Sequence, residues 1–153
     1  MRRKDKEITD KETMEQILDK AEVIRLAMVD GGEPYLVAMN FAYLNGFLYM
    51  HSAKQGRKID ILLKNSRVAF QADTDVKIQL EEEACESTTR YMSVVGTGNA
   101  SLIDENEEKI KVLDAIMTKH TGRTGFEYSE KAFERTLVIK VVIDSMTGKK
   151  SGY

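Results

Sequence analysis

Residues 43–58 read YLNGFLYMHSAKQGRK and join a β-hairpin to the start of a helix. Asn45-Gly46 lies between two apolar runs, and this dipeptide favours a tight hairpin turn because both residues tolerate positive φ. The second run ends at His51. From residue 56 to residue 64 the apolar side chains recur at helical spacing, which predicts a short helix. The segment therefore predicts strand, turn, strand, loop and helix in that order.

Three cations gather where this helix begins, namely Lys54, Arg57 and Lys58. Cations at a helix N-terminus oppose the helix dipole, so helix stability alone does not explain them. An anion at this position would explain them, because free backbone N–H groups and cationic side chains would converge on it. Ser52 and Gly56 suit a phosphate for the same reason: a hydroxyl and an unhindered amide. The pattern predicts a phosphate site, and the alternative is an ordinary solvated helix face.

The remaining sequence predicts a mainly β fold with few helices. Helices are expected over residues 10–20, starting from a Thr9–Glu12 capping box, and over 108–120, capped by Asp104, with a helical turn at 129–133. The apolar stripe of the helix at 108–120 is predicted to be Ile110, Leu113, Ile116 and Met117. Strands are expected over 23–29, 35–43, 47–50, 67–72, 76–80, 91–103 and 137–143, the last buried on both faces. Hairpin-linked strands favour an antiparallel barrel (an α+β, mainly β class).

Composition narrows the class of protein. The chain has 153 residues, enough for one domain, and 23 basic residues against 25 acidic ones leave a formal charge of -2. This balance argues against nucleic-acid binding. No apolar run is long enough to cross a membrane, and we expect no membrane partner. The lone Cys85 allows no intrachain disulfide, and with no secretory signal the sequence predicts a cytoplasmic protein. No metal-ligand spacing is present.

From about residue 21 to residue 142 the chain resembles the pyridoxamine 5'-phosphate oxidase-like FMN-binding split barrels. Within them it is most similar to the 5-nitroimidazole-resistance (Nim) branch. The resemblance rests on the order and spacing of short motifs: Pro34-Tyr35, Asn45-Gly46, Tyr49-Met50-His51-Ser52-Ala53, Gly56-Arg57-Lys58, Asn65-Ser66-Arg67-Val68, Ala84-Cys85 and Tyr91-Met92-Ser93-Val94-Val95-Gly96-Thr97-Gly98.

The resemblance implies a single split-barrel domain over residues 1–153 that binds FMN at the interface of a homodimer. The strand at 36–40 would lay its backbone along the isoalloxazine ring, the strand end at 49–52 would border the ribityl chain and phosphate, and Arg57 and Lys58 would hold the phosphate. Tyr91 would approach the cofactor from the neighbouring subunit. The cofactor-binding residues implied are Val37, Ala38, Met39, Asn40, Tyr49, Met50, His51, Ser52, Lys54, Arg57, Lys58 and Tyr91.

The activity implied is that of an FMN-dependent oxidoreductase that reduces a small electron-poor acceptor such as a nitroimidazole. His51 is the candidate catalytic residue, because a histidine at the strand end can donate a proton near neutral pH; the alternative is a histidine that only packs beside the cofactor. Two other functions stay open: a flavin carrier or sensor without turnover, and a haem-binding split barrel. His120, at a helix end, and Cys85, in an acidic loop, are expected to be structural.

Overall fold

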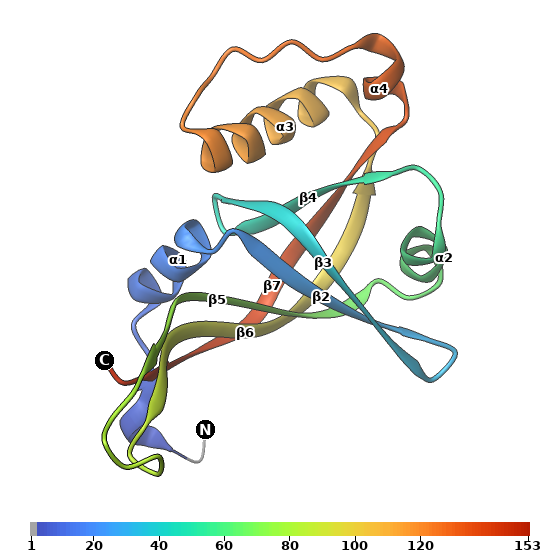
Figure 1. Cartoon of the computed structure of the whole chain (residues 1–153). Coiled ribbons are helices and arrows are strands. Elements are labelled where there is room, and N and C mark those ends of the chain that lie inside the picture. The colour runs from blue at the N-terminus through green and yellow to red at the C-terminus, as the bar shows by residue number, and fades with distance from the viewer. Residues whose placement is uncertain (1–2) are drawn as a thin grey trace.

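The computed structural model describes residues 3–153, which form one antiparallel sheet with helices around it (Figure 1). The strands are β1 (Glu7–Ile8), β2 (Val23–Asp30), β3 (Glu33–Leu44), β4 (Phe47–Ala53), β5 (Arg67–Gln79), β6 (Thr88–Ile103) and β7 (Thr136–Ser151). The helices are a 3-10 turn at Lys4–Lys6, α1 (Lys11–Lys20), α2 (Arg57–Lys64), α3 (Asn106–Thr121) and α4 (Glu130–Glu134). None of the helices in the described part of the chain is long and apolar enough to cross a membrane.

The sheet runs in the order β1-β7-β4-β3-β2-β5-β6 and closes because β7 also pairs with β6. This antiparallel arrangement with few helices confirms the predicted fold class. The interior is apolar, and Leu26, Phe41, Leu48 and Phe70 are at most 1% exposed there. The Asn45-Gly46 hairpin forms as predicted between β3 and β4, with both residues at positive φ.

A second, smaller core forms outside the barrel, where α3 lies across β3, β4 and β7 (Figure 1). Val112 and Ile116 of α3 pack in this core with Tyr49 of β4 and Val138 of β7. Successive strand residues point to opposite faces. The side chains of β3 and β4 that share a face with Tyr49 therefore lie on the side of the sheet where α3 packs. Two residues of the candidate site lie on this face.

The helix caps and the buried face of α3 correct three predictions. Glu105, not Asp104, caps α3, and its carboxylate accepts hydrogen bonds from the backbone N–H groups of Glu107 and Glu108. The buried stripe of α3 is Lys109, Val112 and Ile116, whereas Ile110 is 46% exposed. Burying the Lys109 ammonium is possible because it bonds Asp104 at 2.9 Å and two backbone carbonyl oxygens. In α1 the cap is Asp10 alone, bonding the N–H of Thr13, without the capping box.

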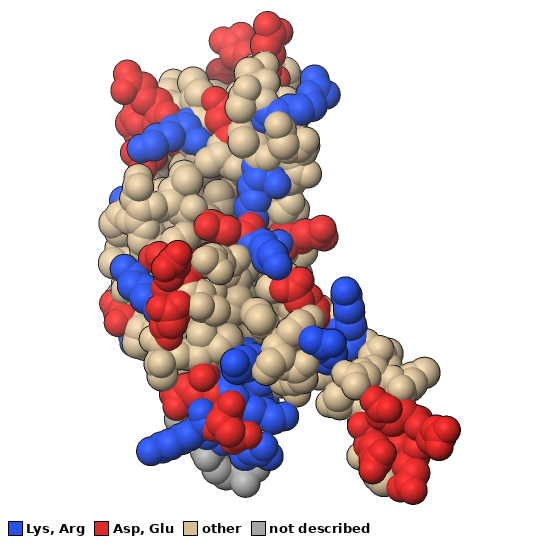
Figure 2. Space-filling view, turned by 90° about the vertical axis from the view of Figure 1, so that its left-hand side faces the viewer, with Lys and Arg blue, Asp and Glu red and all other residues tan. Residues whose placement is uncertain are grey.

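The strand boundaries correct three further predictions. β5 is one strand through residues 67–79 with an irregularity after Thr74, where the sequence predicts two strands. β6 begins at Thr88, before the predicted start, and β7 continues to Ser151, well beyond the predicted end. In β7 the residues from Leu137 to Ile139 are all buried, so both faces are covered there as predicted, but Val142 is 44% exposed. The extended β5 and β6 form an arm that projects from the barrel and carries the acidic tip of residues 81–86 (Figure 2).

Candidate functional site

The barrel is open between β3 and β4. These strands pair only from Phe41 to Leu44 of β3 and from Phe47 to Met50 of β4. Before Phe41, β3 bonds only β2, and after Met50, β4 bonds only β7. The facing edges of residues 34–40 and 51–53 therefore keep backbone N–H and C=O groups that no neighbouring strand takes up. Such groups need partners, and a polar ring can supply them. We call this opening the split.

Alternation along β3 and β4 sets which side chains reach the split. The side chains of Met39 and Met50 are buried in the barrel core, and Val37 packs against it. Tyr49 is buried under α3, and Ser52 is buried with its hydroxyl donating to the Ala53 carbonyl at 2.9 Å. The side chains of Met39, Tyr49, Met50 and Ser52 are buried, so a ligand in the split meets mainly their backbone, whereas Val37 keeps a partly exposed side chain. Ala38, Asn40 and His51, in contrast, have exposed side chains.

The start of α2 closes one end of the split and lacks a side-chain cap. Gly56 is the N-cap, with φ 125°, which a residue with a side chain adopts only under strain. The three other α-helices of the described chain are each capped by a side chain: Asp10, Glu105 and Ser129. The first N–H groups of α2 are therefore left for water or for an anion.

Two of the three predicted phosphate cations already have carboxylate partners. The Arg57 guanidinium lies 3.1 Å from Asp30 and stacks over the ring of Tyr35 at 4.6 Å. The Lys54 ammonium lies 2.5 Å from Asp104. Arg57 thus lies toward the β2–β3 turn and Lys54 toward α3. Both ion pairs are exposed, and exposed pairs contribute only about 0.2–1 kcal/mol. A phosphate dianion can therefore replace either carboxylate at low cost.

His51 and Lys58 lie on the remaining side of the split. Lys58 forms no ion pair among the residues described. His51 keeps an exposed edge. Its pKa is lower than the ordinary histidine value because the protein packed behind it desolvates the ring and because Lys58 and His120 carry like charge. Burial is the largest of these causes. At neutral pH the imidazole is therefore mainly neutral, so that one ring nitrogen can donate and the other can accept a hydrogen bond.

His120 also belongs here, although nothing in the sequence indicates it. Its Nε2 lies 3.4 Å from Nδ2 of Asn40, 80 positions away in the chain, because α3 brings its last turn onto the outer face of β3. Its position at a helix end has an ordinary explanation in the helix dipole, so no local signal identifies it as a site residue.

Tyr91 is the one predicted residue that the structure does not bring to the split. Tyr91 lies opposite Ser151 on β7, whereas His51 lies opposite Val138, at the other end of that 16-residue strand. The two positions are separated by roughly 40 Å of extended chain. Within one chain, Tyr91 is therefore remote from the split.

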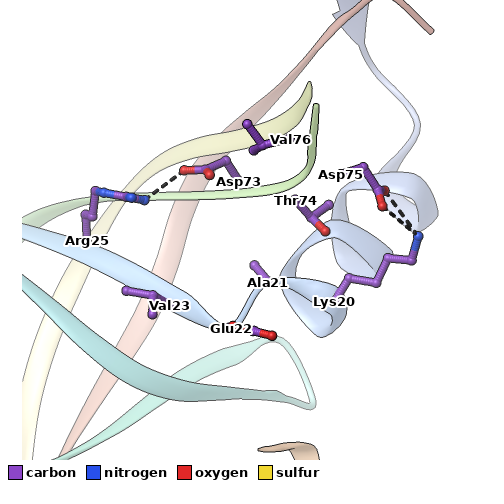
Figure 3. Close-up of a pocket in the computed structure, with 9 residues that line it drawn as sticks. All are labelled: Lys20, Ala21, Glu22, Val23, Arg25, Asp73, Thr74, Asp75 and Val76. Carbon is purple, nitrogen blue, oxygen red and sulfur yellow. Dashed lines mark hydrogen bonds and ion pairs between the residues drawn. The ribbon is translucent and has the colours of Figure 1, made fainter. Parts of the chain in front are cut away.

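A separate hollow of about 460 Å³ lies between the end of α1, the start of β2 and the irregularity in β5 (Figure 3). Its polar groups bond one another: Lys20 lies 3.1 Å from Asp75, and Arg25 lies 2.7 Å from Asp73. None of the predicted site residues lines it. We therefore place the candidate site at the split, where the predicted residues gather.

An antiparallel barrel split between two strands, with an uncapped cationic helix start beside the opening, defines the chain as a split-barrel protein. A family model described as pyridoxamine 5'-phosphate oxidase matches residues 10–150. The chain therefore belongs to the pyridoxamine 5'-phosphate oxidase family. The resemblance noted in the sequence is confirmed.

Solved structures of the same fold agree with this family assignment. A protein from Bacteroides thetaiotaomicron assigned to 5-nitroimidazole antibiotic resistance shares 36% identity, with a TM-score of 0.82 over 94% of this chain and 86% of its own. An FAD- and heme-binding protein from Mycobacterium smegmatis has 21% identity and a TM-score of 0.80, over 97% of this chain and 74% of its own. An FAD-binding protein from Mesorhizobium loti has 24% identity and a TM-score of 0.68, over 94% and 96%. The last two show the fold alone. Curated protein sequences gave no significant match.

Proposed function

We propose that this chain is an FMN-binding flavoprotein that holds its cofactor in the split. The observation that supports this most directly is the combination of two open backbone edges, on β3 and β4, with the uncapped start of α2. The edges suit the polar rim of a flat ring, and the helix start suits a phosphate. The FAD-binding proteins of the same fold, from Mycobacterium smegmatis and Mesorhizobium loti, support a flavin as the ligand.

In this proposal, different residues of the split contact different parts of the cofactor. Arg57, Lys58 and the first amides of α2 hold the phosphate, with Lys54 available if Asp104 releases it. The backbone of residues 37–40 lies along the isoalloxazine ring, and residues 49–52 border the ribityl chain. When bound, FMN supplies the electron transfer through its ring. His51 contributes an imidazole at the exposed edge, whose protonated form, a minority at neutral pH, gives a proton to the reduced acceptor.

We further propose that the acceptor is a small electron-poor molecule such as a nitroimidazole, and that the working form is a homodimer with FMN at the interface. Two observations favour the dimer. Tyr91, which the resemblance implies as a cofactor residue, is remote from the split of its own chain, so that role requires a second copy. The arm also exposes large apolar side chains, with Val76, Ile78 and Leu80 54%, 75% and 79% exposed, a surface that a second copy can cover.

The absorbance spectrum of the purified chain tests the cofactor. After incubation with FMN and gel filtration, retained flavin bands near about 370 and 450 nm are expected, as for protein-bound flavins in general. A Soret band after expression would favour the haem alternative, and a colourless protein whose melting temperature ignores FMN would contradict both. Bleaching by NADH or NADPH and reoxidation by a nitroimidazole would separate an enzyme from a flavin carrier.

The phosphate assignment has its own test in the double variant Arg57→Ala, Lys58→Ala. Losing two charge-assisted hydrogen bonds should weaken FMN binding at least about 100-fold, measured by quenching of flavin fluorescence. The matched control is Lys111→Ala with Lys131→Ala, which removes two exposed cations from α3 and α4. Circular dichroism should show both variants folded. Unchanged FMN affinity in the first variant would rule out this phosphate site.

A further inference from the structure

Asn40, His51 and His120 share one face of the molecule, and we call them the two-histidine cluster. Asn40 and His51 are the next positions after the last β3–β4 pair, Phe41 with Met50, so they face each other across the mouth of the split. Alternation puts both on the side that α3 covers, together with Ala42 and Tyr49. His120 reaches Asn40 from α3 at 3.4 Å. A face on which the sequence predicts one imidazole therefore has two.

The last turn of α3 is fixed, so His120 is not a loosely held surface side chain. The neighbouring Lys119 ammonium donates to the Leu18 carbonyl at 2.8 Å and lies 3.4 Å from the centre of the Phe41 ring. Gly122 ends the helix with φ 68°, and its N–H bonds the Thr118 carbonyl at 2.8 Å. These contacts tie the turn to α1 and to β3 independently of His120. On this fixed turn the imidazole lies beside the Asn40 amide at the mouth of the split.

The charges that act on His51 are positive: that of Lys58 of α2, and that of His120 of α3 when its imidazole is protonated and no longer accepts from Asn40. On β7, the Lys140 ammonium lies over the rings of Phe47 and Tyr49, at 4.2 and 5.7 Å from their centres. Among residues 3–153, no carboxylate bonds either imidazole. Cationic and donor groups without an acidic partner suit a ligand that presents oxygen atoms carrying partial or full negative charge.

We propose that the two-histidine cluster is the acceptor-binding face of the flavin site, and that His120 is a positioning residue in it. This inference rests on the proposed function and deepens it. The nitro oxygens of an electron-poor acceptor take hydrogen bonds from His51 and from the Asn40 amide, whose orientation His120 sets by bonding its Nδ2. The substrate class is a flat molecule with a nitro group at one end.

Binding of 2-methyl-5-nitroimidazole to the FMN-loaded chain tests this, with 2-methylimidazole as the analogue that lacks the nitro group. His120→Gln should weaken binding of the nitro compound about fivefold, the effect of one misplaced neutral hydrogen bond, and leave the weak binding of the analogue unchanged. Lys111→Gln, which removes an exposed cation from the same helix, should change neither. Equal affinities of the parent chain for both compounds, or of the parent and His120→Gln for the nitro compound, would overturn the proposal.

A second measurement does not depend on the cofactor. Proton NMR titration of the flavin-free chain follows the imidazole of His51 directly. Removing the neighbouring charge in His120→Gln should raise the pKa of His51, whereas Lys111→Gln should not. An identical pKa of His51 in the parent chain and in His120→Gln would show that the two imidazoles do not interact, and would contradict the cluster. Because FMN affinity is measured for the parent chain, a failure to bind FMN would count against the proposed function while this titration still judged the cluster.

Discussion

Arg57 is bonded to Asp30, and a phosphate at the proposed site would compete with that carboxylate. Its guanidinium bonds Asp30 at 3.1 Å, so a phosphate must displace a carboxylate. Asp30→Asn keeps the shape of the partner and removes its charge. Since exposed ion pairs contribute about 0.2–1 kcal/mol, FMN should bind up to about fivefold more tightly to this variant at low salt. Titration by fluorescence quenching measures it.

The control for that prediction is Asp144→Asn. Asp144 forms an equally exposed ion pair with Arg67, far from the split on β7, and its replacement should leave FMN affinity as it was. An Asp30→Asn chain that bound FMN no better than the Asp144→Asn chain would show that Arg57 does not exchange Asp30 for the phosphate.

Lys119 makes the stability of the fold depend on pH in a defined direction. Burial, partly offset by the charge of Asp19, lowers the pKa of its ammonium to about 8. The unfolded chain keeps the ordinary lysine pKa and so binds more protons between these two values. The free energy of unfolding therefore rises as the pH increases from about 8 toward the ordinary lysine value, by about 1 kcal/mol after allowance for its partial exposure.

Urea unfolding at about pH 7.5 and about pH 9.5, on either side of the start of this range, measures the difference. Lys119→Met serves as the reference, because it fills the same space over Phe41 without a titrating group. The parent chain should gain stability relative to Lys119→Met on going to the higher pH. A parallel pH dependence in the two chains would mean that the amine titrates normally in the folded state.

At the scale of single elements, β6 depends on two glycines at which neighbouring residues lie too close for a side chain. A Cβ at Gly96 would overlap the Phe70 ring and come within 2.6 Å of the Ser145 carbonyl oxygen. A Cβ at Gly98 would strike the Val142 backbone, just where the β6–β7 register shifts. Both contacts are with packed neighbours that cannot yield cheaply, so the glycines allow the strands to approach closely.

Gly96→Ala should lower the free energy of unfolding by about 1–3 kcal/mol, the usual effect of overpacking a core. Ser101→Ala, on an exposed position of the same strand, should change it by less than about 0.5 kcal/mol. Urea unfolding monitored by circular dichroism compares them. Equal stabilities of the two variants would show that the barrel relaxes around the added methyl group.

The elements differ in how far the sequence predicts them, and the physical reason is the range of the forces involved. The Asn45-Gly46 hairpin and α2 are encoded locally, by turn chemistry and helical spacing, and both form as predicted. The second half of β7 has no alternating pattern, because Asp144 to Ser151 is largely polar. It is a strand only because β6 and β1 pair with it. Similarly, β5 continues through its own polar middle because β6 pairs with it both before and after the irregularity.

At the scale of the whole molecule, the sequence predicts one half of the candidate site and gives no signal for the other. The cations before α2 and His51 lie in one continuous segment, so they could be assigned together. His120 reaches the split from a helix whose orientation depends on packing of Val112 and Ile116 against β4 and β7. The predicted stripe of α3 is right at Ile116 but includes the exposed Ile110 and omits the buried Val112, so the sequence alone does not fix which residue at the end of the helix meets Asn40.

The arrangement of two copies is the last feature that a mutation can test, through exchange of subunits. In a homodimer with the site at the interface, a split takes its cations from one chain and Tyr91 from the other. Arg57→Ala with Lys58→Ala in one chain, and Tyr91→Ala in the other, should each lower FMN binding alone. In a mixed dimer, one split carries all of the substitutions and the other split carries none. When subunits exchange at random, about half of the dimers are mixed, so about a quarter of all splits should bind FMN normally.

Light scattering establishes the dimer, and flavin absorbance counts the occupied sites. No recovery on mixing would mean that Tyr91 does not act across the interface, and full binding by the Tyr91→Ala chain alone would remove it from the site.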